Sequence, residues 1–248
     1  MGKRRLVFAI TMLLCSTATR AVPILLESAG LGPTGQPTAG LILANTQWGG
    51  WRFDIDQRLE VRQIGGHLTT LRGTLFGALV SVNSSTGLPD FKPSEIEGDA
   101  IAGVTFDSGA PSQDFRTRLN VMLEPGSYAL VFGGGEDGGS GDFPNEDFFI
   151  VHPPAFGSTG AGRMPFDNIP IPGASDASRF FFANTSDIWI PLDPTSTNSI
   201  FRFVVEGNSR RVSEPSTLFL LVGTSLAAFL VRYRSHGLDA IDAMSPHV

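Results

Sequence analysis

The chain has 248 residues with 18 basic and 24 acidic side chains, a net charge of −6, which fits one medium domain and argues against a long multidomain enzyme. Only 17% of residues are charged, while 29 glycines, 17 prolines and 19 phenylalanines indicate many turns and aromatic-rich strands, which disfavours an all-helical bundle. Leaving out six basic residues near the ends and the acids Asp239 and Asp242, residues 22–214 hold 12 basic and 22 acidic side chains, a net −10. That charge argues against a nucleic-acid partner.

The first 21 residues have the three parts of a secretory signal peptide. A basic start, Lys3–Arg5, precedes an apolar stretch, Leu6–Leu14, and small residues follow it. We expect cleavage after Ala21, with Ala18 as the alternative. A buried N-terminal helix is the other interpretation, but the basic start and the apolar length fit export better.

The middle of the chain, 22–211, predicts one all-β domain, an antiparallel β-sandwich. Short strand candidates recur between Gly, Pro, Asn and Asp residues, and no long segment keeps a helical period. Apolar and polar residues alternate clearly in Trp51–Ile55, Leu119–Leu123 and Phe201–Val205, so each should bury one face. The predicted strands are Ala39–Ala44, Gly50–Ile55, Leu59–Ile64, Gly73–Val82, Ala100–Phe106, Arg116–Leu123, Ser127–Phe132, Phe148–Val151, Arg179–Ala183 and Ser199–Val205.

Two short segments between these strands have their own local signals. Pro125 and Gly126 in Glu124–Ser127 predict a tight turn between adjacent strands, with Gly126 at positive φ. Pro93–Glu97 predicts a loop or a single helical turn, capped by Ser94 and ended by Gly98.

The C-terminal segment 212–234 has a polar motif, then an apolar run, then arginines. A helix over 216–231 would rise roughly 24 Å, short of a hydrocarbon core of about 30 Å, and would be a marginal membrane span. Arg232 and Arg234 would stop transfer on the cytoplasmic face, followed by a cytoplasmic extension, 235–248. The motif consists of Ser213, Glu214, Pro215, Ser216 and Thr217.

This tail resembles the PEP-CTERM sorting signal of Gram-negative bacteria, with Ser213 in place of the usual first proline and a long extension after the arginines. The resemblance implies that an exosortase, a membrane protease-transpeptidase, cuts near the motif. It also implies a protein of the cell surface or of an exopolysaccharide matrix. The runs Phe53–His67, Gly73–Val80, Leu123–Val131 and Phe201–Gly207 resemble jelly-roll sandwich domains of other PEP-CTERM proteins.

Two sets of residues are candidates for ligand contacts. Trp48 and Trp51 flank two glycines at a strand start, where exposed indoles could stack on a sugar ring, although core packing is the stronger interpretation. An acidic glycine-rich loop could supply oxygen ligands to calcium, although its spacing fits no EF-hand and a solvated loop is the simpler interpretation. Its carboxylates are Glu136, Asp137, Asp142, Glu146 and Asp147.

No residue pattern predicts an enzyme. Cys15, the only cysteine, lies in the predicted signal peptide, so the processed chain would lack disulfides and thiolate sites. His67 and His152 match no metal-binding motif and are interpreted as structural. The sequence therefore predicts an exported, non-enzymatic surface or matrix protein without a required cofactor. The alternatives are a carbohydrate-binding module, a calcium-dependent adhesin and, least favoured, a hydrolase without identifiable catalytic residues.

Overall fold

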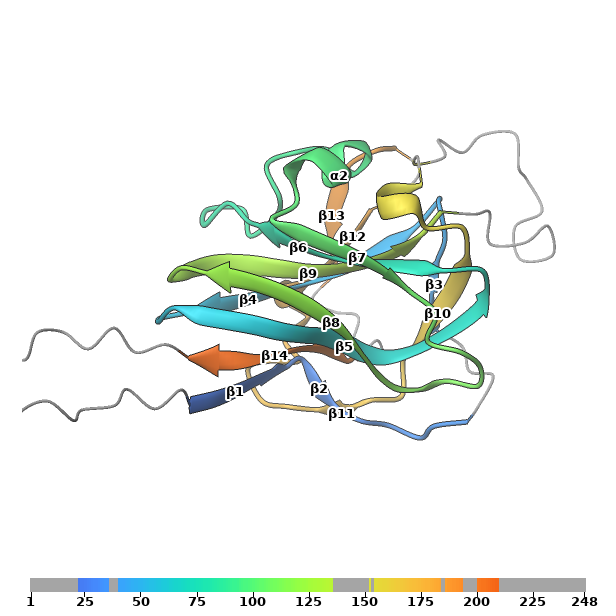
Figure 1. The fold of residues 1–248 in the computed structure, drawn as a ribbon, viewed down its shortest axis with the longest axis horizontal. Coiled ribbons are helices and arrows are strands. Elements are labelled where there is room, and N and C mark those ends of the chain that lie inside the picture. The colour runs from blue at the N-terminus through green and yellow to red at the C-terminus, as the bar shows by residue number, and fades with distance from the viewer. Residues whose placement is uncertain are drawn as a thin grey trace, which may run out of the picture. The chain divides into compact units, whose positions relative to one another are not determined.

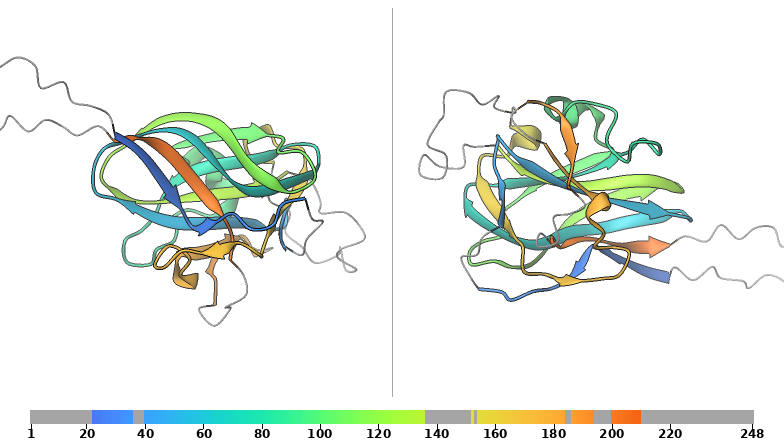
Figure 2. Two further views of the ribbon diagram at one scale, coloured as in Figure 1. Left: turned by 90° about the horizontal axis from the view of Figure 1, so that it is seen from below. Right: turned by 180° about the vertical axis from the view of Figure 1, so that it is seen from behind.

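Two antiparallel β-sheets stack face to face in the computed structural model, which describes residues 22–35, 40–135, 152, 154–183, 186–193 and 200–209. Figures 1 and 2 show the two layers, with the short helices on the outer side of one of them. These described residues belong to one compact unit. The predicted all-β antiparallel sandwich is confirmed.

The larger sheet is organised around β5 (Leu59–Arg72), its longest strand. One edge of β5 pairs with β8, and the other pairs with β14 through residues 59–66 and with β10 through residues 69–72. Strand β1 lies outside β14, and β3 lies outside β10, while β2 and β11 form a separate two-stranded pair. The bounds are β1 Val22–Glu27, β2 Ala29–Gly30, β3 Gly40–Leu43, β8 Gln113–Leu123, β10 Ala161–Pro165, β11 Ile169–Pro170 and β14 Phe203–Ser209.

The smaller sheet has six strands in the order β13-β12-β4-β9-β6-β7. All of its pairings are antiparallel. Its strands are β4 Trp48–Ile55, β6 Leu75–Ser81, β7 Ala102–Phe106, β9 Gly126–Gly134, β12 Phe180–Ala183 and β13 Trp189–Pro191.

Between the two sheets lies the main hydrophobic core, built from alternate residues of the facing strands. The three predicted alternations place their apolar positions in this core, although in Phe201–Val205 the intervening Arg202 and Val204 are buried as well. Phe132 of β9 stacks on Phe203 of β14, with ring centroids 5.4 Å apart. Aromatic rings therefore bridge the two layers at the centre of the sandwich.

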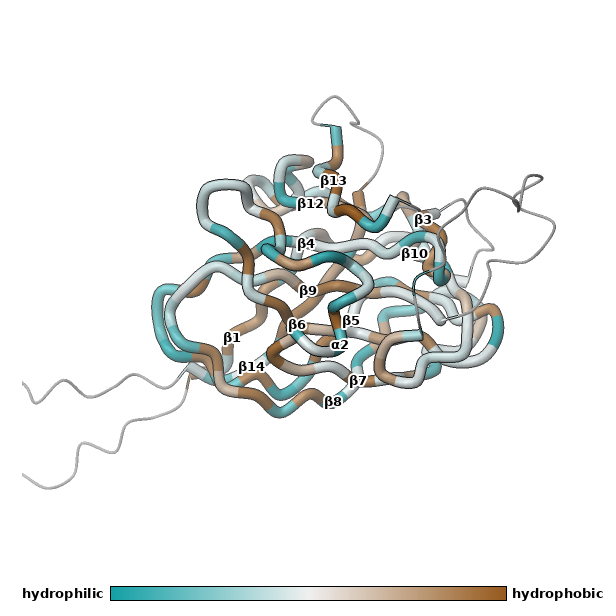
Figure 3. The backbone as a smooth tube through the Cα atoms, turned by 90° about the horizontal axis from the view of Figure 1, so that it is seen from above, coloured by the Kyte–Doolittle hydropathy of each residue, from teal (hydrophilic) through white to brown (hydrophobic). Residues whose placement is uncertain are grey.

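A second hydrophobic cluster covers the outer face of the smaller sheet. It includes Trp48, Phe76 and Val131, which point away from the main core, and it packs beneath short helical segments. Figure 3 looks onto this side, with α2 lying over the sheet and β13 at the edge of the sheet. Strand β6 is consequently buried on both faces, which explains its unbroken apolar run. The helical segments on this side are η1 Pro93–Glu95, α2 Ile96–Asp99 and η3 Ala155–Gly157, whereas η4 Ala177–Arg179 directly precedes β12 and has no residue in the cluster.

Several predicted elements differ from the observed ones. Strands β1, β2, β10, β11 and β13 were not predicted, and β14 spans Phe203–Ser209 rather than Ser199–Val205. Strand β5 continues eight residues beyond the predicted end at Ile64, because β8 and β10 supply partners for the added residues. The candidate Phe148–Val151 lies outside the described residues.

The two local signals are confirmed only in part. The turn at Glu124–Ser127 exists, but it joins β8 of one sheet to β9 of the other, and Gly126 is not at positive φ. In the helical segment, Lys92 N–H donates to Glu95 Oε2 (2.9 Å), and α2 continues through Gly98. Ser94 does not cap this turn, because its hydroxyl donates to a distant carboxylate.

Both predicted processing segments, 1–21 and 212–234, lie outside the described residues, as does the extension 235–248. In the part of the chain that the structure describes, no helix is long and apolar enough to cross a membrane.

Candidate functional site: a groove beside Trp189

Trp48 and Trp51 are buried, which confirms core packing as the stronger interpretation and excludes the two indoles as sugar contacts. Trp48 is 0% exposed and Trp51 is 3% exposed. The Trp48 indole N–H donates to Gly134 O (3.2 Å), and its ring meets Phe76 edge-on at 4.9 Å. Because Trp48 and Trp51 point to opposite faces of β4, one fills the outer cluster and the other the main core. Neither indole can stack on a sugar.

His67 is buried in the larger sheet and has a structural contact. Its Nδ1 lies 2.9 Å from Asn168 Oδ1, while Asn168 Nδ2 donates to the main-chain oxygens of Pro165 and Ile200. Because those two donations fix the amide orientation, Asn168 Oδ1 accepts and His67 Nδ1 must carry the proton. The imidazole thus ties β5 to the segments that precede β11 and β14.

Arg202 forms a buried charged network next to His67. Its side chain donates to Glu27 Oε1 (2.7 Å), to Asp114 Oδ1 (3.2 Å) and to Ala29 O. Asp114 also accepts from Arg116 Nη1 at 2.6 Å. Burial alone would lower the pKa of the Arg202 guanidinium, but its two carboxylate partners outweigh that effect and raise it. This network connects β1, β8 and the start of β14.

The paired carboxylate of Asp114 makes the stability of the folded protein sensitive to acid. Burial would raise the pKa of its carboxyl, but hydrogen bonds from Arg116 and Arg202 outweigh burial and hold the pKa below its ordinary value. The carboxylate therefore contributes stability that is fully present above the unfolded pKa of about 3.9 and lost as pH falls through the lower folded pKa.

We expect the free energy of unfolding to fall as the pH drops from about 5 to about 2, and to fall less in Asp114→Asn than in the parent. Chemical denaturation across this range measures the difference. Asp56→Asn, an exposed acid on the β4–β5 turn, is the matched control. Parallel pH curves for the parent and Asp114→Asn would contradict the prediction.

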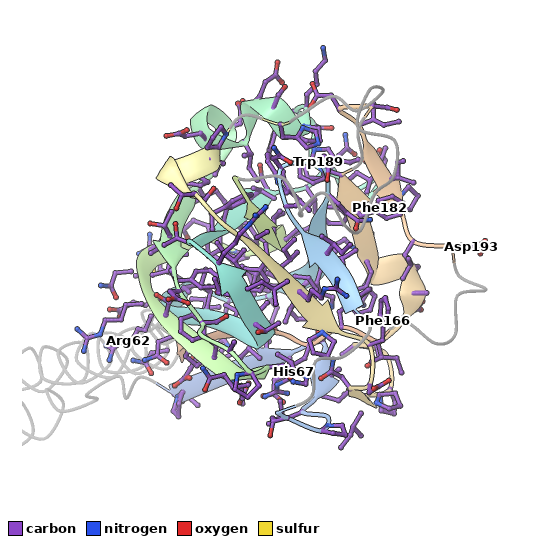
Figure 4. The ribbon with its side chains drawn as sticks, turned by 90° about the vertical axis from the view of Figure 1, so that its right-hand side faces the viewer. Arg62, His67, Phe166, Phe182, Trp189 and Asp193 are labelled. Atoms are coloured by element: carbon purple, nitrogen blue, oxygen red, sulfur yellow. The ribbon has the colours of Figure 1, made fainter. Side chains whose placement is uncertain are left out.

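On the side of the molecule opposite to His67, an open groove of about 470 Å³ lies between the loop before η1 and strand β13. Figure 4 shows Trp189, at the groove, and His67 on opposite sides of the molecule. We call this hollow the Trp189 groove. Its apolar lining is Leu88, Pro89, Phe91, Pro93, Ile188 and Trp189, and its polar lining is Thr86, Asp90, Lys92, Glu95 and Asp187.

Three hydrogen bonds lock the two walls of the groove together. Asp187 accepts from Ser94 N–H at Oδ1 (2.8 Å) and from the Ser94 hydroxyl at Oδ2 (2.7 Å). The Trp189 indole N–H donates to Phe91 O (2.7 Å). Asp187 adopts φ of 55°, a left-handed conformation that is uncommon outside glycine and in which Asp is among the enriched residues. The walls are therefore preorganised.

Behind the groove, Ser94, Asp187 and His152 form a line of side chains. His152 Nδ1 lies 3.4 Å from Asp187 Oδ1, and its buried ring packs on Trp48 at 4.5 Å. In a catalytic triad the imidazole stands between the serine and the acid, whereas here the carboxylate stands in the middle. This line positions Asp187 and the groove wall, and it does not have the geometry that activates a serine.

The other predicted site residues cannot be placed. The calcium candidates Glu136, Asp137, Asp142, Glu146 and Asp147, the sorting motif, Arg232, Arg234 and Ala21 all lie outside the described residues. Within the described ranges, no three or more His, Cys, Asp or Glu side chains gather as metal ligands would.

No family model matches the chain, and no curated protein matches it. Among solved structures, a chain of T=1 particles derived from infectious bursal virus is similar over 79% of this chain and 41% of its own length, with 13% identity and a TM-score of 0.23. A chain of the infectious bursal disease virus Gx strain is similar over 85% of this chain and 49% of its own length, with 14% identity and a TM-score of 0.20. The chain thus spans less than half of these solved chains, and scores this low carry no argument about fold or function.

Proposed function

We propose that this chain is an exported, non-enzymatic protein of the cell surface or of an exopolysaccharide matrix in a Gram-negative-type bacterium. Its jelly-roll-like ectodomain would be delivered by an N-terminal signal peptide and held, at least transiently, by a short C-terminal transmembrane helix. An exosortase-type protease would recognise the tail. The sequence of the two ends is the basis of this proposal.

One structural observation supports it. The first and last described strands, β1 and β14, pair antiparallel, with Val22 opposite Ser209. Among the described residues, the side chains of both hydrophobic clusters lie between Ile24 and Val205. Cleavage after Ala21 and near Pro215 would therefore keep every described residue of these clusters, together with both paired ends of β1 and β14.

Replacing both Glu214 and Pro215 by alanine tests the proposal in the native host. We expect the parent to lose its tail and to reach the surface or matrix fraction, and the double variant to remain uncut in the membrane fraction. Glu206→Ala, which removes an exposed acid of β14 outside the motif, is the control and should be processed like the parent. Unchanged processing of the Glu214, Pro215 double variant would refute recognition of this motif.

A further inference from the structure

We propose that the Trp189 groove binds an amine-bearing glycan, a chain of hexosamine units with free amino groups. This site is separate from the tryptophans that the sequence suggested. It also goes beyond the sorting proposal, since the groove belongs to the sandwich and its binding can be measured whether or not the tail is processed.

The floor of the groove suits the apolar face of a sugar ring. Ile188 is 52% exposed, and Phe91 and Leu88, which line the same groove, are half-buried. Pyranose rings present C–H groups on one face, and such a face packs on aromatic and aliphatic side chains. The Trp189 indole is 8% exposed and serves mainly to hold this floor in place through Phe91 O.

The rim of the groove selects a positive charge. Three carboxylates, Asp90, Glu95 and Asp187, line the groove with the single ammonium of Lys92. Asp187 contributes only its charge, because both of its oxygens already accept from Ser94. One oxygen of Asp90 accepts from Asn83 Nδ2 (3.0 Å), and one oxygen of Glu95 accepts from Lys92 N–H, so both carboxylates are held in position. Residues 22–214 carry a net −10, which repels anionic sugars and attracts a cationic one.

The adjacent strand favours a glycan over a peptide. An extended peptide would bind here most readily by adding to the outer edge of β13, through main-chain hydrogen bonds. Strand β13 has only three residues and ends at Pro191, which has no N–H to donate. A ligand recognised through hydroxyl and amino groups does not need that edge.

The test uses the purified full chain and a glucosamine oligomer with free amino groups. The chain has three tryptophans, and only Trp189 lines the groove, so its indole N–H resonance should shift on titration while those of Trp48 and Trp51 stay in place. Trp189→Phe assigns the resonance. The N-acetylated form of the same oligomer, which lacks the charge, should bind about tenfold more weakly.

Matched variants test whether binding of the amino oligomer depends on the carboxylates at the rim of the groove. Asp90→Asn with Glu95→Gln keeps an acceptor oxygen at each position but removes both charges, and should weaken binding about tenfold or more. Asp56→Asn with Glu206→Gln removes two charges elsewhere and should leave binding unchanged. Melting temperatures of all variants show whether each is folded.

Three outcomes would overturn the assignment. The first is the absence of a Trp189 shift with the amino oligomer. The second is equal binding of the acetylated oligomer, which would remove the role of charge. The third is a stronger Trp189 shift with an oligolysine peptide, which would make this a site for basic peptides. Tail processing can succeed or fail independently of each result.

Discussion

Replacing Arg202 by methionine is expected to lower the free energy of unfolding by about 3 to 5 kcal/mol, the usual cost of removing one partner of a buried ion pair. Arg202 is 5% exposed, and its guanidinium is the shared donor for Glu27, Asp114 and Ala29 O. Methionine fills similar space but leaves the partly buried carboxylates without their common partner. Denaturant unfolding of the purified variant measures the loss.

The matched control is Arg62→Met. The Arg62 side chain is 57% exposed and lies 3.6 Å from Glu60, a surface pair whose contribution is within about 1 kcal/mol. If Arg202→Met lost no more stability than Arg62→Met, the Arg202 network would not hold β1 and β8 to β14 as we describe.

Trp48→Ala is expected to cost a similar amount, about 3 to 5 kcal/mol, because it empties the centre of the outer hydrophobic cluster. It removes ring contacts with Phe76 and His152 and leaves Gly134 O without its indole donor. The residue was a sugar-contact candidate in the sequence, so this variant also separates the two roles. Loss of a core tryptophan lowers the melting temperature, whereas loss of an exposed sugar-binding tryptophan would weaken only sugar binding.

Ile188→Ala provides the opposite case. Ile188 is 52% exposed on the floor of the Trp189 groove, so we expect little change in stability and weaker binding of the amino oligomer.

For the first of these two variants, a Trp48→Ala protein as stable as the parent would contradict the burial of the Trp48 indole.

The sequence was sufficient to predict the sandwich wherever period-two alternation is strong. In Trp51–Ile55 the apolar residues occupy every second position, and they all contribute to the main core. The same pattern could not show that β4 has a second buried face. Trp48 lies on that other face, and it is buried only because segments distant in sequence, around α2 and η3, cover it.

The missed strands have weak local signals. Val22–Glu27 contains Pro23 and lacks a clear alternation, and Ala161–Pro165 contains a glycine and a proline. Each forms a strand because a long partner pairs with it: β14 for β1, and β5 for β10. Likewise, Pro125 and Gly126 favour a chain reversal at Glu124–Ser127, but no local sequence feature specifies that the two connected strands belong to different sheets.

The Trp189 groove could not be predicted from one sequence. Its walls meet through Ser94 and Asp187, which are 93 positions apart, and no motif connects them. The nearest signal in the sequence was the possible helical turn at Pro93–Glu97. Only the packing of this loop against β13 shows that it forms a groove with Trp189.

The most direct test of the account is the intact mass of the protein isolated from its native host. We expect a species that begins at Val22 and lacks the segment from about Pro215 onward, which corresponds to the sandwich with both ends removed. A membrane-bound species that still carries 235–248 would contradict sorting by cleavage, and would make the protein a permanently anchored surface protein instead.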